Sequence, residues 1–129
     1  MQEVLTIRVV LEEEYEVQKG EALVRMINFS GDCECENFHG RILKGGVDTQ
    51  QQNGTPLTLS ARYMLKGTDR EGHSCSIFIE NNAVEAEGEL RTSPHILTDS
   101  ECLSFLNQAR LEGALESWEK GVIIHIYEL

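Results

Sequence analysis

The sequence predicts an all-β domain, either a barrel or a sandwich of short strands. The first observation is the spacing of 11 glycines, which separate short runs rich in Val, Ile, Leu and aromatic residues. The second is that proline occurs only at Pro56 and Pro94, and that no repeat or low-complexity tract interrupts this rhythm. The length of 129 residues suits one domain, residues 1–129, because such a chain buries about two-thirds of the surface exposed on unfolding.

Strands are predicted in the first part of the chain wherever an apolar run lies between turn residues. These runs are residues 4–15, 22–30, 33–37, 39–43 and 57–66. The pair Gly45-Gly46 breaks the chain, and Gln51-Gln52-Asn53-Gly54 indicates a turn, because Asn-Gly tolerates a positive φ.

The run 57–66 has the clearest alternation. Odd-numbered residues from Leu57 to Leu65, including Ala61 and Tyr63, are apolar and share one face. The other face carries Thr58, Ser60, Arg62 and Met64.

The last part of the chain is predicted to form further strands and one short helix. The strands are residues 73–81, 89–97 and 122–129. Helical spacing of apolar residues predicts a helix over residues 99–107, with Asp99 as its N-cap. Residues 108–116 fit either a continued helix or a strand. In the final strand, Ile123, Ile124 and Ile126 place apolar residues on both faces, which favours a barrel and association into a homo-oligomer.

The net charge of −11 excludes two classes of partner. Nucleic acids and anionic membrane surfaces are bound by clustered Lys and Arg, whereas this chain has 11 basic and 22 acidic residues. The acidic run 12–14 and the alternating Glu85, Glu87 and Glu89 are expected to be solvated and to discourage strand-edge pairing. Because no signal peptide or apolar span of about 20 residues is recognisable, the expected location is the cytoplasm.

The cysteines and the common motifs indicate no metal and no cofactor. Cys33, Cys35, Cys75 and Cys102 are expected to be reduced thiols, and the first two would point to one face of a strand. No Cys-x-x-Cys or His-x-x-x-His pair supplies further metal ligands. Phosphate-binding loops, dinucleotide loops and nucleophile elbows are also missing from the sequence.

Five polar residues embedded in apparent strands are the candidate ligand-binding residues: Asp48, Arg62, Glu80, Asn81 and Arg91. Charges in the middle of a strand usually lie on a solvated face. The neighbours of Arg62 on its face, Thr58, Ser60 and Met64, are less polar than an outer surface usually is. If the two arginines and two acids share one lumen, they would pair, because buried charges require partners. Such a cluster would leave room for a carboxylate, enolate or carbonyl oxygen of a ligand.

Several segments together resemble an uncharacterised family of bacterial and fungal proteins, a domain of unknown function with a lipocalin-like barrel. The segments are Gly45-Gly46-Val47-Asp48, Ala61-Arg62-Tyr63, Asn81, Arg91-Thr92-Ser93-Pro94, Phe105-Leu106-Asn107 and Ile126-Tyr127-Glu128. The resemblance covers about residues 31–129. The resemblance implies a single antiparallel barrel of about eight strands, a size that either fills with side chains or holds one small ligand. The family pattern falls on Asp48, Arg62, Asn81 and Arg91, and implies no role for them.

Three functional hypotheses follow. The leading one is a barrel that binds a small, partly apolar molecule. Arg62 and Arg91 would anchor a ligand oxygen, and Asp48 and Asn81 would orient those arginines or bond the ligand. The second is an enzyme of the cyclase or isomerase type, in which Asp48 or Glu80 acts as acid or base if burial raises its pKa. The third is a structural barrel in which the charged residues form a closed ion network without a cavity.

Overall fold

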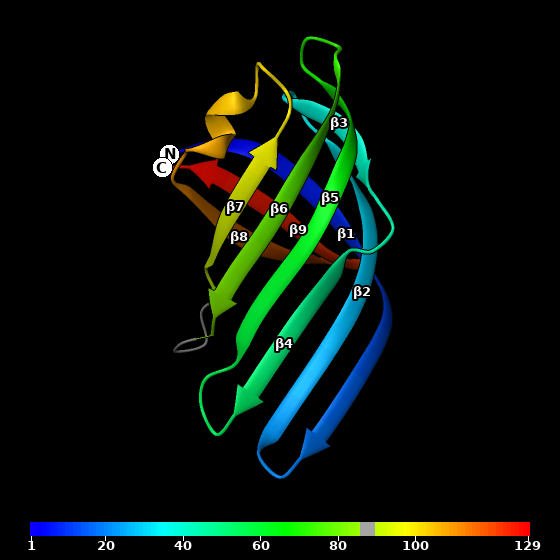
Figure 1. The fold of residues 1–129 in the computed structure, drawn as a ribbon, viewed down its shortest axis with the longest axis vertical. Helices are drawn as coiled ribbons and strands as arrows, with labels where there is room; N and C mark the ends of the chain where they lie inside the picture. The colour runs from blue at the N-terminus through cyan, green and yellow to red at the C-terminus, as the bar shows by residue number, and fades with distance from the viewer. Residues whose placement is uncertain (86–89) are drawn as a thin grey trace.

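The computed structural model describes residues 1–85 and 90–129. Within these residues, nine strands form one antiparallel sheet that closes on itself (Figure 1). The strands are β1 (Gln2–Lys19), β2 (Ala22–Glu34), β3 (Phe38–Ile42), β4 (Val47–Asn53), β5 (Thr58–Asp69), β6 (Ser74–Val84), β7 (Thr92–Thr98), β8 (Leu111–Trp118) and β9 (Gly121–Glu128). The prediction of an all-β antiparallel barrel is confirmed.

The described strands occupy eight positions around the barrel, because β3 and β4 share one position. Both pair with β2 on one side and with β5 on the other. Gly45 bends the chain between them at a φ of 113°, which residues with a side chain rarely adopt. The pairing of β1 with β9 closes the ring and brings the two termini side by side (Figure 1). Closure covers the edge of β1 over residues 2–10, which pair with β9, whereas residues 14–19 pair with β2 alone.

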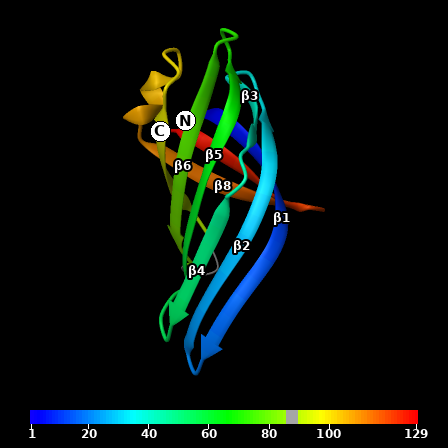
Figure 2. The same cartoon turned by 45° about the vertical axis from the view of Figure 1, so that its right-hand side comes forward.

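The hairpin of β1 and β2 extends beyond the barrel together with β4 and the start of β5 (Figure 2). A β-bulge between Leu11 and Glu14 shifts the register of β1 at the base of this extension. After the bulge, Glu14 and Glu16 lie opposite Ile27 and Arg25 of β2. Residues 12–14 are exposed, as the acidic run predicted.

The end of the barrel near the termini is filled with apolar side chains. The fully buried residues there come from many strands and from a short 3₁₀ helix, η1 (Ser104–Asn107), and they include Leu5, Ile7, Phe38, Leu65, Ile77, Leu103 and Leu106. Leu103 and Leu106 are exposed by 0% and 1%, so side chains of the η1 segment form part of the apolar core at this end. Any internal space therefore lies toward the other end of the barrel.

The predicted helix over residues 99–107 is shorter than expected, and Asp99 does not cap it. Only Ser104–Asn107 are helical in this segment, and the Asp99 carboxylate instead accepts the backbone N–H of Ser76 (2.8 Å). Ser100 Oγ accepts the backbone N–H of Leu103 (3.3 Å) and donates to Asp69 (2.7 Å). Bonds to neighbouring strands thus outweigh the local helical signal.

Other boundaries differ by a few residues. Cys33 and Glu34 finish β2, and residues 35–37 form a bend where a separate strand was expected over 33–37. The ambiguous segment 108–116 contributes the first part of β8. Glu87 and Glu89, and with Glu89 the expected start of the strand 89–97, lie outside the described residues.

The outer face carries one apolar row across three strands. Met64, Phe78 and Leu97 are successive register partners in β5, β6 and β7, and Met64 and Leu97 are exposed. Ile124 and Ile126 point into the core, while His125 between them points outward. Association into a homo-oligomer stays a prediction. No helix in the described part of the chain has the length and hydropathy needed to cross a membrane.

Candidate functional site

A row of inward-facing residues crosses the middle of the barrel wall. Asp48 of β4, Ala61 of β5 and Asn81 of β6 are register partners in succession. Residues directly opposite each other on neighbouring strands point to the same face. Because Ala61 has only a methyl group, Asp48 and Asn81 flank a gap in the inner surface of the wall.

This gap belongs to a cavity of about 80 Å³. Three polar side chains line it, those of Asp48, Asn81 and Thr92. The rest of the wall is apolar: Val9, Leu11, Phe29, Leu59, Ala61, Ala83, Leu90, Leu115, Val122 and Ile124. An apolar pocket with a few convergent polar groups is the usual composition of a small-molecule site.

The polar atoms in this cavity are unusual because protein groups do not satisfy them. Among residues 1–85 and 90–129, four buried side-chain polar atoms lack a hydrogen-bond partner. Three of them, Asp48 Oδ1, Asn81 Oδ1 and Thr92 Oγ1, belong to residues that line this one cavity. A buried polar atom without a partner costs about 1–3 kcal/mol, so such atoms rarely cluster in a core that is only structural.

A glycine in β8 lies opposite Thr92 and leaves room for its side chain. Thr92 of β7 pairs with Gly113 of β8. A Cβ atom on residue 113 would lie 2.1 Å from Thr92 Oγ1 and 3.5 Å from Asn81 Nδ2. The glycine therefore leaves the space that the Thr92 hydroxyl occupies beside the cavity.

Asp48 is connected to the surface of the hairpin extension by a chain of polar contacts. Gln50 Nε2 donates to Asp48 Oδ2 (2.9 Å), and Gln50 Oε1 accepts from Arg25 Nη1 (3.4 Å). Arg25 also forms ion pairs with Glu14 (2.9 Å) and Glu16 (2.7 Å). Burial raises the pKa of Asp48, and the hydrogen bond from Gln50 opposes that effect.

The sequence did not single out Arg25 or Thr92 as site residues. Arg25 lies between Val24 and Met26, so an embedded charge was visible there. Its approach to Gln50 depends on the bulge in β1 and on the pairing of β2 with β4, which no local pattern indicates. Thr92 gave no signal, because a threonine in a strand is ordinary.

Three of the five predicted site residues lie outside the cavity. Arg62 is exposed on the outer face of β5, opposite Glu80 of β6. Arg91 is exposed and forms an ion pair with Glu112 (3.2 Å). The expectation that Arg62, Glu80 and Arg91 share one lumen with Asp48 is therefore corrected. The physical reason is strand alternation: burying Tyr63, Leu65, Ile77 and Ile79 forces the even-numbered residues of β5 and β6 outward.

A closed antiparallel barrel of this size with a small, largely apolar cavity is the architecture of β-barrel proteins that can hold one small ligand. The chain belongs to the family described as "Protein of unknown function (DUF3237)", whose model matches residues 1–85. The resemblance stated from the sequence motifs is thus confirmed. The matched span also includes residues 1–30, which those motifs had left out.

Solved structures share the fold over nearly the whole chain. A protein with unknown function from Clostridium acetobutylicum has a TM-score of 0.82 and 23% identity, over 99% of this chain and 97% of that one. A beta-barrel like protein from Acinetobacter baumannii has a TM-score of 0.74 and 20% identity, over 98% and 93%. A protein described as an enzyme from Penicillium herquei has a TM-score of 0.73 and 14% identity, over 98% and 92%. Among curated proteins, none matches the chain.

Proposed function

We propose that this protein binds a small, partly apolar molecule that carries a hydroxyl or N–H group in the barrel cavity. The observation that carries the proposal is the convergence of Asp48 Oδ1, Asn81 Oδ1 and Thr92 Oγ1, all without protein partners, on one apolar cavity. A ligand donor would satisfy these atoms, and the cavity wall would hold the ligand's apolar part. The binding residues are then Asp48, Asn81 and Thr92, with the two arginines of the sequence hypothesis replaced by Thr92.

The chemistry of the three atoms defines the ligand class. The Asn81 carbonyl accepts hydrogen bonds, and the Thr92 hydroxyl both donates and accepts. Asp48 accepts hydrogen bonds when ionised and can also donate one when protonated. An alcohol or an amide matches this set, whereas a second carboxylate would meet two acceptor oxygens. The space of about 80 Å³ limits the buried part of the ligand to a few heavy atoms.

The test compares two small probes of similar size, butan-1-ol and butan-2-one, in titrations followed by backbone amide NMR. Butan-1-ol carries a donor, and butan-2-one only accepts. We expect butan-1-ol to shift the amides of Ala61, Asn81 and Thr92 and to bind more tightly than the ketone. Replacement of Asn81 by leucine should weaken butan-1-ol binding about fivefold, because one hydrogen bond contributes about 1 kcal/mol.

The matched control is Asn82→Leu, because Asn82 is the next residue of β6 and points to the other face, where it donates to Glu80 (3.1 Å). This variant should bind both probes like the unmodified protein. The proposal fails if neither probe shifts the amides that line the cavity. It also fails if Asn81→Leu and Asn82→Leu change binding equally.

An enzyme that uses the same cavity, of the cyclase or isomerase type, is a second candidate. Two observations favour it: a fungal protein of the same fold is described as an enzyme, and burial raises the pKa of Asp48. A carboxyl group with a raised pKa can act as an acid or base. Fold likeness alone does not define activity, so the direct test is carboxyl-carbon NMR of Asp48 against pH. A pKa of Asp48 at or below 3.8, its ordinary value, would remove this candidate.

A further inference from the structure

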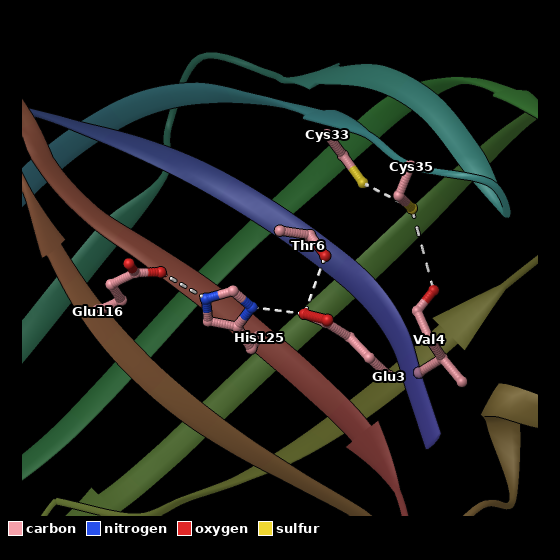
Figure 3. Close-up of polar contacts among 7 residues, drawn as sticks. All are labelled: Glu3, Val4, Thr6, Cys33, Cys35, Glu116 and His125. Atoms are coloured by element: carbon pink, nitrogen blue, oxygen red, sulfur yellow. Dashed lines mark hydrogen bonds and ion pairs between the residues drawn. The ribbon is translucent and has the colours of Figure 1, made fainter.

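A pair of cysteine thiols lies toward the other end of the barrel from the cavity. Cys33 is in β2 and is fully buried, and Cys35 follows in the bend after this strand and is partly exposed. Their sulfur atoms are 3.6 Å apart (Figure 3). Two-residue spacing in an extended segment points side chains to one face. Cys35 lies where the strand gives way to the bend, and there its sulfur contacts that of Cys33.

The two sulfurs differ in access to solvent. Cys35 lines a surface cleft of about 270 Å³, together with Thr6, Asn37 and Arg70. The Arg70 guanidinium reaches Asn37 Oδ1 (3.2 Å) across this cleft. Cys33 lies behind Cys35, with an exposure of 0%, in the apolar core. A small molecule in the cleft therefore meets Cys35 first, and Cys33 is held within reach behind it.

The surroundings of Cys35 favour its ionised form. The hydrogen bond from the Cys33 thiol lowers the pKa of Cys35, and so do the backbone N–H groups of Thr6, Asn37 and Phe38, while desolvation opposes them. The hydrogen bond with Cys35, and then burial, raise the pKa of Cys33. This asymmetry divides the roles: Cys35 holds the nucleophilic thiolate and Cys33 the neutral thiol.

We propose that Cys35 and Cys33 form a peroxide-reactive thiol pair that closes reversibly to a disulfide. The Cys35 thiolate attacks one oxygen of a hydroperoxide and breaks the O–O bond. This step gives a sulfenic acid on Cys35 and releases water or an alcohol after one proton is taken up. The Cys33 sulfur then attacks the Cys35 sulfur and displaces hydroxide, which takes up the Cys33 thiol proton and leaves as water. In sum, the two thiols lose two protons and two electrons, and the hydroperoxide is reduced to water and an alcohol, or to two waters when it is hydrogen peroxide.

The step requires only a local movement. An S–S bond is about 2 Å long, so the sulfur atoms must approach from the present 3.6 Å. Cys35 lies in the bend of residues 35–37 and has a weak contact to the Val4 carbonyl (4.0 Å), which it can give up. The buried Cys33 can stay in place in the core. A disulfide that spans a single residue is strained, so a small thiol would reopen it.

The experiment treats the reduced 129-residue chain with hydrogen peroxide, blocks remaining thiols with iodoacetamide and maps the tryptic peptides by mass. Trypsin places both cysteines in one peptide, residues 26–41, since no Lys or Arg lies between Arg25 and Arg41. We expect this peptide to become lighter by two hydrogens, to carry no alkyl group, and to regain both alkylation sites after treatment with dithiothreitol. Its oxidation should be about tenfold faster than that of Cys75 or Cys102.

A variant separates the two steps of the proposal. In Cys33→Ala, the Cys35 sulfenic acid has no resolving partner and should be trapped by dimedone on residues 26–41. The matched control Cys75→Ala removes a buried thiol outside the pair and should leave the oxidation of residues 26–41 unchanged. The proposal is overturned if peptide 26–41 of the unmodified protein keeps two alkyl groups after peroxide. A cross-link to Cys75 or Cys102, or irreversible sulfinic acid as the main product, would overturn it equally. The three results that would overturn the proposal are measured on the unmodified chain, so they do not depend on the folding of either variant.

Discussion

Replacement of Asn81 by leucine removes a buried carbonyl oxygen that has no hydrogen-bond partner. Asn81 is 5% exposed, and its side chain lines the cavity beside Ala61. Leucine has the same number of side-chain heavy atoms and no polar group. The substitution therefore relieves the desolvation penalty of the orphaned oxygen without forcing a new atom into a packed wall.

The magnitude follows from the penalty for an unsatisfied buried polar group, about 1–3 kcal/mol. We expect Asn81→Leu to raise the free energy of unfolding by about this amount. With an unfolding entropy of about 2.1 cal/mol/K per residue, a chain of 129 residues gains about 4 °C in Tm per kcal/mol. The expected increase in Tm is therefore about 4–11 °C. Stability gained together with weaker ligand binding is the usual trade-off at a binding site.

The assay is urea unfolding at equilibrium, followed by circular dichroism, with differential scanning calorimetry for Tm. Asn82→Leu is the control, because it removes an amide from the outer face and loses the bond to Glu80, so its stability should stay equal or fall. A loss of more than about 1 kcal/mol in Asn81→Leu would refute the reasoning. In that case the Asn81 side chain would make a stabilising hydrogen bond in solution.

Two further predictions concern other parts of the barrel. His125 lies between Glu116 (2.8 Å) and Glu3 on the outer face (Figure 3), and hydrogen bonds to Glu116 and then Glu3 raise its pKa. A raised pKa in the folded state means that the stabilisation is complete below the unfolded value of 6.5 and is lost as pH rises through the folded value. Near pH 6 the unmodified protein should thus have a free energy of unfolding up to about 1 kcal/mol higher than that of His125→Gln, and near pH 9 the two values should converge. An equal difference at both pH values would contradict this. Gly113→Ala places a Cβ 2.1 Å from Thr92 Oγ1 and should lower the free energy of unfolding in urea by about 1–3 kcal/mol. Adding Thr92→Ala to this variant should restore most of the loss. If the double variant shows no recovery, the clash lies elsewhere.

Local patterns were enough to predict the class of fold and most strand positions. The alternation over residues 57–66 identified Tyr63 and Leu65 as an inward face, and burial follows that alternation in the structure. The same pattern placed Arg62 on the opposite face. The weakly polar neighbours of Arg62 on its strand face argued for burial. The opposite face, however, carries the large apolar side chains that must be buried, and this requirement turns Arg62 outward.

The candidate site was only partly predictable for the same reason. Asp48 and Asn81 were singled out as polar residues in strands, but their convergence depends on the register of β4, β5 and β6, which places Ala61 between them. Register is a long-range property, because it is set by how each strand buries its apolar face against the others. Thr92 joins the site through the close approach of Gly113 on β8.

The order of the residues is enough to predict which side chains each strand offers to its two faces, because the two-residue period of a strand is local. It also placed Cys33 and Cys35 on one face, and the sulfur contact of 3.6 Å agrees with that. Which face of each strand lies inside, and where the barrel is filled, depends on how the strands pack together. That packing also decides which polar atoms meet without partners. Those outcomes arise because closing the sheet aligns residues far apart in the chain, and because the η1 segment fills one end and leaves the space at the other.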